Sequence, residues 1–431
     1  MRVTNRARRV AAPAAAEARV ASTDTYVLWR AYLLIMLAAA FDVYDWLDRS
    51  VQGGSNRYLI IAVPVVAAVW IRLRQPGFLV RRPMPSDVVL FALFLFGLGG
   101  ALIGVTFLGT EQNARPVFLP MMVAFLYLVT TQDPTDREIS KMLNWLSLIA
   151  TGYAAMNALV NLQVFPGLLQ FKQYRNASVA MVALAVATAI VLGNRRRLIF
   201  VLVLAAIIFV TYPSATSVLV GASVVLTFYL TGRRASGLRT IVVVGTIVTV
   251  STLALVNFDR GVELADRYFA VVDKANANSG RLDLWSEGLE RWREAPIFGN
   301  GFAGEVTAVR DRDERTLPFH NDFVLFLANG GLVGLGLLVA WFVLMELTLL
   351  RRYRGFVRAD DMSRAGLLRA ILVCLNAFVV AMAFNPVLPG ASRSVTIFGL
   401  YAIAMSLGEP APTRSVSRER SRLSEPAVPS V

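Results

Sequence analysis

The chain has 431 residues, of which 56% are hydrophobic and 17% charged, and its 43 basic and 29 acidic residues give a formal net charge of +14. A soluble domain carries about 25% charged residues, so this composition excludes an ordinary soluble protein and points to lipid as the main solvent. The basic excess does not indicate nucleic-acid binding, because the basic residues stand in short clusters between apolar runs and not in a patch interleaved with aromatic residues.

The N-terminal segment 1–25 is rich in Ala and Arg and has no continuous apolar stretch, so we expect a cytoplasmic tail and not a signal peptide. Apolar runs then follow that are long enough, or nearly so, to cross the hydrocarbon core as helices, which takes about 20 residues. The segment 26–257 holds nine of them and 322–408 holds three; they lie near 26–43, 57–73, 87–108, 117–132, 142–161, 177–193, 198–212, 214–231, 239–257, 322–349, 366–384 and 393–408. The sequence therefore predicts an all-α, polytopic membrane protein with about 12 transmembrane helices.

Clusters of arginine set the orientation. With twelve spans, every cluster falls on the same side of the membrane; the clusters are Arg6, Arg8 and Arg9; Arg72, Arg74, Arg81 and Arg82; Arg195 to Arg197; Arg233, Arg234 and Arg239; Arg351, Arg352, Arg354 and Arg358; and Arg414, Arg418, Arg420 and Arg422 in the tail 409–431. The positive-inside rule assigns that side, with both termini, to the cytoplasm. The same count places one long loop, 258–321, outside the cytoplasm.

This long loop is predicted to contain a helix from Arg281 to Ala295, with Ser279 as a candidate N-cap. An apolar stripe recurs at three- and four-residue spacing along it, formed by Leu282, Trp285, Leu289 and Trp292. We expect such a helix to lie along the membrane interface with its tryptophans at headgroup depth, and Pro296 to end it. Gly299 and Gly301 favour a tight turn and not a nucleotide site, since no strand precedes them.

Two single residues stand out. His320 is the only histidine, and it lies where the loop rejoins the membrane, beside Asn321 and Asp322. An unperturbed pKa near 6.5 suits histidine to general-base work, although a structural role is an equal alternative at this stage. Cys374 is the only cysteine, so no intrachain disulfide can form, and its apolar surroundings favour a packing role.

Taken in order, one set of residues resembles the signature of the O-antigen ligase and polymerase superfamily over about 60 residues: Ser279-Gly280-Arg281, Trp285, Pro296, Gly299, Gly301, His320-Asn321, Asn329-Gly330-Gly331 and Gly334. The resemblance implies an inverting GT-C glycosyltransferase of the bacterial inner membrane. Its members transfer a glycan from undecaprenyl diphosphate to a hydroxyl, on lipid A–core oligosaccharide in ligases or on a second lipid-linked glycan in polymerases. The implied mechanism takes no cofactor and no metal.

The resemblance also implies residue roles. His320 would be the general base, and Arg281 would be the loop arginine that holds the diphosphate, for which the guanidinium fork is well matched. Arg175, in the segment Lys172–Asn176, stands where the family has a second arginine, but the glycine expected shortly after it is absent. Asn321 and Trp285 would support the site, which would be periplasmic.

Several alternatives stay open. Asp42, Asp45 and Asp48 follow the first span on the outside, where some metal-dependent GT-C enzymes carry a catalytic carboxylate. Asp311-Arg312-Asp313 has the pattern of a metal-binding DxD motif, but that motif belongs to soluble α/β enzymes. A transporter or flippase of lipid-linked oligosaccharide also suits twelve spans, although two related halves are not evident. The sequence does not choose between ligase and polymerase.

Overall fold

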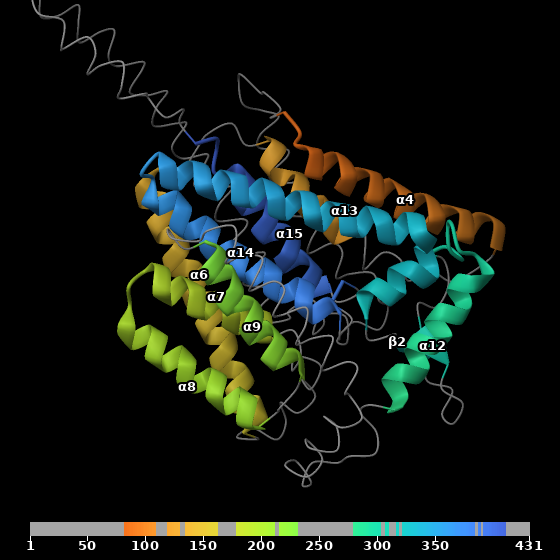
Figure 1. The fold of residues 1–431 in the computed structure, drawn as a ribbon, viewed down its shortest axis with the longest axis horizontal. Coiled ribbons are helices and arrows are strands. Elements are labelled where there is room, and N and C mark those ends of the chain that lie inside the picture. Colours follow the sequence, from red (N-terminus) through yellow and green to blue (C-terminus); the bar gives the residue numbers. More distant parts are fainter. Residues whose placement is uncertain are drawn as a thin grey trace, which may run out of the picture.

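The computed structural model describes residues 82–108, 119–129, 134–162, 178–211, 215–231, 279–302, 307–309, 316–318, 321–383, 387–388 and 391–410. Its helices are α4 (Pro85–Leu108), the 3₁₀ helix η1 (Leu119–Val129), α6 (Asp136–Asn161), α7 (Ser178–Val191), α8 (Arg195–Thr211), α9 (Ala215–Leu230), α12 (Ser279–Glu294), α13 (Asp322–Arg358), α14 (Met362–Met382) and α15 (Ala391–Ser406) (Figure 1). Strands β1 (Thr307–Val309) and β2 (Thr316–Pro318) pair antiparallel, with Ala308 opposite Leu317. The predicted helical fold is confirmed, and the short ribbon in the long loop is an addition to it.

The predicted apolar runs from 87–108 to 214–231 and from 322–349 to 393–408 each coincide with one of these helices, although the ends differ. The runs 26–43, 57–73 and 239–257 lie outside the described residues, as do the tail 1–25 and residues 411–431. Among the described helices, α13 and α14 are long and apolar enough to cross a membrane, and shorter apolar stretches occur in α4, α7, α9 and α15. These helices support a membrane protein; the count of twelve stays a prediction.

Helix α14 forms the centre of the bundle and contacts α6, α7, α9, α13 and α15 (Figure 1). From Leu367 to Phe378 its side chains are buried, except those of Arg369 and Asn376, which are partly exposed. A helix that is apolar on every side is expected in such a central place. The Cys374 thiol is buried and donates to the backbone oxygen of Ala180 on α7 at 3.4 Å, so its predicted packing role is confirmed.

Large apolar side chains face outward on the periphery of the bundle. On α8 these are Ile199, Phe200, Leu202 and Val203, and on α13 they are Leu332, Val339, Val343 and Leu347. Exposed apolar surface of this extent is unusual on a soluble monomer and suits contact with lipid.

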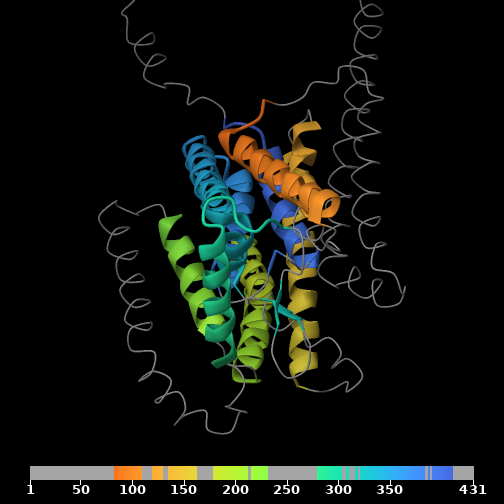
Figure 2. The same cartoon turned by 90° about the vertical axis from the view of Figure 1, so that its right-hand side faces the viewer.

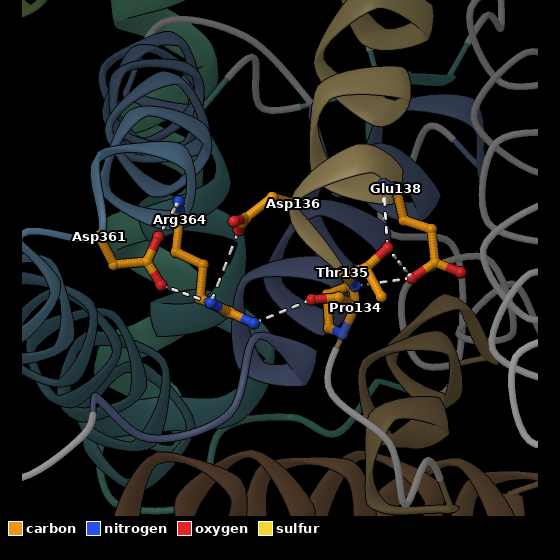
Figure 3. Close-up of polar contacts among 6 residues, drawn as sticks. All are labelled: Pro134, Thr135, Asp136, Glu138, Asp361 and Arg364. Atoms are coloured by element: carbon orange, nitrogen blue, oxygen red, sulfur yellow. Dashed lines mark hydrogen bonds and ion pairs between the residues drawn. The ribbon is translucent and has the colours of Figure 1, made fainter. Parts of the chain in front are cut away.

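Polar contacts gather the starts of α4, α6 and α14 with the ends of η1, α9, α13 and α15. Figure 3 shows one of them: the Arg364 guanidinium pairs with Asp361 and donates to the backbone oxygen of Pro134 at 2.9 Å, and it lies 3.9 Å from Asp136. Thr135 and Glu138 cap the start of α6 through their side chains, 3.0 Å apart (Figure 3). These contacts fix the start of α14 against the start of α6.

Three further contacts lie at the same end of the bundle. The buried Arg352, near the end of α13, donates to the backbone oxygens of Met405, at 3.0 Å, and Gly408, after α15. The Tyr353 hydroxyl donates to the backbone oxygen of Thr231, which follows α9. Asp87, at the start of α4, accepts from the Tyr127 hydroxyl near the end of η1 and from Tyr401 on α15. The elements therefore alternate in direction through the bundle.

Candidate active site

The helix predicted in the long loop is present as α12, which begins at Ser279 and ends at Glu294. Ser279 is its first helical residue and not, as predicted, the residue before it. Beyond the helix, the Trp292 indole nitrogen donates to the backbone oxygen of Pro296 at 3.1 Å. Figures 1 and 2 show α12 at the edge of the bundle, and its main contact is with α13.

The face of α12 that packs on α13 differs from the predicted stripe. Leu284 and Gly288 are buried, whereas Leu289 is 40% exposed and Trp285 and Trp292 are only partly covered. Leu284 packs in a small cluster with Val324, Leu325 and Ala328 of α13. The periodicity predicted the helix correctly, and the stripe's expected place at the membrane interface stays a prediction.

Immediately after α12, the chain inserts into a break in α13. Gly331 has φ 59° and ψ −160°, which interrupts the helix. In a regular helix the N–H of Leu332 would donate to the oxygen four residues earlier. Instead, the N–H groups of Leu332 and Val333 donate to the backbone oxygens of Pro296 and Ile297, at 2.9 and 3.0 Å.

The helix carbonyl groups that precede the break also find hydrogen-bond donors in the segment after α12. The N–H groups of Asn300 and Gly301 donate to the backbone oxygens of Ala328 and Asn329, at 3.4 and 2.8 Å. Two helical hydrogen bonds are thus replaced by four bonds to the loop, and no helix-end group of this set is left unpaired. We call this contact, between residues 296–301 and 328–333, the glycine interlock.

An aromatic plug closes the interlock from the bundle side. Phe302 is 1% exposed and meets Phe326 of α13 and Phe96 of α4 edge-on, with ring centroids 5.1 and 6.3 Å apart. A Cβ at Gly330 or Gly334 would lie 3.1 Å from the ring of Phe302 or Phe96, respectively, so these glycines let the rings pack closely against α13. The loop is therefore anchored to two helices of the bundle.

At the start of α13, Asn321 is the N-cap. Its Oδ1 accepts from the N–H groups of Phe323 and Val324, at 2.9 and 3.2 Å, and its backbone is extended. Such a cap satisfies donors that the first turn of a helix leaves free. The predicted supporting residue therefore holds the helix end that begins directly after His320.

Asp322 forms a second contact at this end that the sequence did not indicate. Its carboxylate is fully buried, and Oδ2 accepts from the N–H groups of Val387 and Leu388, both at 2.9 Å. Arg393, in the first turn of α15, interacts electrostatically with this carboxylate. Asp322 thereby ties the start of α13 to the connection between α14 and α15. An Asp directly after an N-cap is common, so its long-range contact carries no sequence signal.

The structure describes some of the predicted site residues and not others. Arg281 lies in the first turn of α12, and Trp285 lies one turn further on, partly exposed. The Arg281 side chain is outside the described part, and so are His320, Arg175, the aspartates Asp42, Asp45 and Asp48, and the 311–313 motif. Within the described residues, no cluster of His, Cys, Asp or Glu could hold a metal ion.

The comparisons with known proteins fit this arrangement. Residues 214–339 match the family model described as O-Antigen ligase. The match begins at α9, includes α12, and ends in α13 beyond Gly334, so it contains the whole interlock and the start of α13. No curated protein matches the chain. The match over residues 214–339 supports the resemblance to the O-antigen ligase and polymerase superfamily that the sequence signature predicted.

Proposed function

We propose that this protein is a metal-independent, inverting glycosyltransferase of the GT-C type, which moves a glycan from undecaprenyl diphosphate to a hydroxyl acceptor at the periplasmic face of the bacterial inner membrane. The observation that carries the proposal is the family match over 214–339, because it covers the region where the described part of the long loop docks on the bundle. The acceptor would be lipid A–core oligosaccharide or a second lipid-linked glycan.

The packing of α12 on α13 supports a shared site for the two main candidate residues. Leu284 lies one turn after Arg281, and its partner Leu325 lies one turn after Asn321. His320 directly precedes Asn321 in the sequence. The first turn of α12 and the residue before α13 thus belong to the same end of one packed helix pair.

The chemistry assigns a role to each side chain. His320 accepts the proton of the acceptor hydroxyl as its oxygen attacks the anomeric carbon, and the bond from that carbon to the diphosphate breaks on the opposite face. Arg281 and Arg175 hold the departing diphosphate by charge-assisted hydrogen bonds, which replace a metal ion. Asn321 holds the start of α13 in place, and Trp285 supports the site from α12, one turn after Arg281.

The contacts within the bundle support the twelve-span topology with both termini inside. Arg352, Arg364 and the end of α9 belong to segments that the positive-inside rule assigns to the cytoplasm, and they meet at one end of the bundle. Asp322 stands at the outer end of the predicted span 322–349, and the loop half of the interlock, residues 296–301, belongs to the loop assigned to the periplasm. In a Cys374→Ser background, an impermeant maleimide added to intact cells should label Asp313→Cys and not Asn194→Cys.

The test of activity uses single substitutions with a matched control. His320→Ala should lower glycan transfer by roughly 10²- to 10⁴-fold, as loss of a general base does. Arg281→Ala removes a charge-assisted contact of about 1.5–3 kcal/mol, a roughly 10- to 150-fold loss. The control is Arg291→Ala, on the same helix, where the guanidinium pairs with Glu287 at 2.9 Å and unchanged transfer is expected.

The assay supplies the purified, reconstituted protein with lipid-linked glycan, with or without lipid A–core. Capped lipid A–core as the product would identify a ligase, and elongated lipid-linked glycan would identify a polymerase. Transfer that persists in both His320→Ala and Arg281→Ala, at wild-type membrane levels of protein, would reject the proposed mechanism. Movement of lipid-linked glycan across liposomes without any transfer would favour a flippase instead.

A further inference from the structure

We propose that Gly299 and Gly331 are positioning residues: their contact in the glycine interlock sets where α12 lies on α13, and hence where Arg281 stands relative to the start of α13. The docking claim follows from the backbone geometry, and the consequence for glycan transfer rests on the function proposed above. Neither glycine would contact a substrate.

Both positions require the absence of a side chain for two separate reasons. Gly299 and Gly331 have φ of 71° and 59°, in the left-handed region that L side chains rarely adopt. A Cβ on Gly299 would also lie under 3.0 Å from backbone atoms of Asn329 and Gly330, and one on Gly331 would meet Ile297 and Gly299 as closely. Since the obstacles are backbone atoms, neither can move aside without parting the loop from the helix.

Parting them would break paired groups on both sides at once. The Leu332 and Val333 donors and the Ala328 and Asn329 acceptors have their loop partners only while the backbones touch. The helix itself cannot close over the gap while Gly331 keeps its φ and ψ. The interlock is therefore held in one register, and a side chain at either glycine displaces the loop as a unit.

The displacement would be amplified at the far end of α12. From Arg281 to Glu294 the helix rises about 20 Å, at 1.5 Å per residue. A tilt of roughly 10° at the interlock would move the first turn by about 3 Å, whereas a misplacement of about 1 Å can cost a reaction 100-fold. The contact of Leu284 with Leu325 and Ala328 is a small apolar cluster. We expect it to be too weak to hold the start of α12 in place when the interlock tilts the helix.

The test compares glycines that differ only in their surroundings. Gly299→Ala and Gly331→Ala are the test variants, and Gly336→Ala is the control, because a Cβ at Gly336 of α13 meets no atom within 4 Å. Docking is read from oxidative cross-linking of Leu284→Cys to Ala328→Cys, which replace two side chains of one cluster, in a Cys374→Ser background. Glycan transfer by the same full-length, reconstituted proteins is measured before and after oxidation.

We expect both test variants to lose at least tenfold in cross-linking rate and in transfer, at membrane levels close to wild type, and Gly336→Ala to lose neither. Slow oxidation that finally traps α12 on α13 should restore part of the transfer in Gly299→Ala, which a general loss of folding would not allow. Cross-linking as fast as in Gly336→Ala would overturn the docking claim. Lost transfer with normal cross-linking would overturn the positioning claim. If the wild-type protein itself shows no transfer, the proposed function is refuted, and the cross-linking rates still test the docking claim.

Discussion

The buried carboxylate of Asp322 offers a quantitative test of how the start of α13 is held. Asp322→Ala removes Oδ2, which accepts from the Val387 and Leu388 N–H groups at 2.9 Å each and is their acceptor among the described residues. Each buried donor left unpaired costs about 1–3 kcal/mol, so the pair costs roughly 2–6 kcal/mol. The Oδ1 atom is buried without a hydrogen-bond partner in the described part of the chain, so its removal offsets some of this loss. We expect a net destabilisation of about 2–4 kcal/mol.

The assay is thermal unfolding of the detergent-solubilised protein. With an unfolding entropy of about 2.1 cal/mol/K per residue, this loss lowers the midpoint by roughly 2–5 °C for a chain of this length. Asp322→Asn keeps an oxygen acceptor without the charge and should fall between wild type and Asp322→Ala. The control is Asp136→Ala. The Asp136 side chain is 76% exposed, and its ion pair with Arg364 is long, at 3.9 Å, so we expect an effect on stability within about 0.5 kcal/mol. A midpoint for Asp322→Ala equal to that of Asp136→Ala would refute the reasoning.

Three other substitutions test the opposite end of the bundle. Arg352→Met should destabilise the protein by about 2–4 kcal/mol, because two buried carbonyl acceptors lose a charged donor, whereas the exposed Arg354→Met should be neutral in the same thermal assay. Gly355→Ala should lower the midpoint, since its Cβ would meet the Pro410 ring under 3.0 Å away, and the protein should regain stability with Pro410→Gly. Arg369→Leu should loosen α9 from α14, seen as faster proteolysis after Thr231, because its guanidinium donates to Thr231 at 2.8 Å and to the Phe228 backbone at 2.9 Å.

The sequence predicted those features that depend on local pattern. The helix at Arg281–Ala295 follows from spacing and from Pro296, and α12 occupies almost the same residues. The apolar runs likewise coincide with helices because hydropathy is summed over a whole segment. The side of α12 that packs on α13 was not predicted, since the apolar stripe with Leu289 was expected to face the membrane interface and nothing in the local pattern indicates which other side meets a helix. Local sequence signals thus predict where a helix forms, but not which other helix it packs against.

The contacts around the candidate site are long-range, and for that reason they were not predictable. Asn321 directly before an apolar run is a recognisable N-cap signal, so this role could have been found. The pairing of Leu332 with Pro296 could not, because backbone oxygens carry no sequence identity. Gly299 and Gly301 favoured a tight turn and Gly331 belonged to the family signature, but neither observation indicated that Gly299 and Gly331 are in contact. Two glycines so far apart in the sequence can be recognised as contact partners only from the folded structure.

Two helix ends near the candidate site show why the proposed mechanism depends on arginine. A helix N-terminus is often an anion-binding site, because its first N–H groups point outward unpaired. At the start of α13, however, the N–H groups of Phe323 and Val324 are taken by Asn321, and at the break those of Leu332 and Val333 are taken by loop carbonyls. These four donors are therefore committed to the fold. A diphosphate beside these two ends of α13 would need its charge balanced by other groups, and guanidinium groups, with their paired N–H donors, match its oxygens.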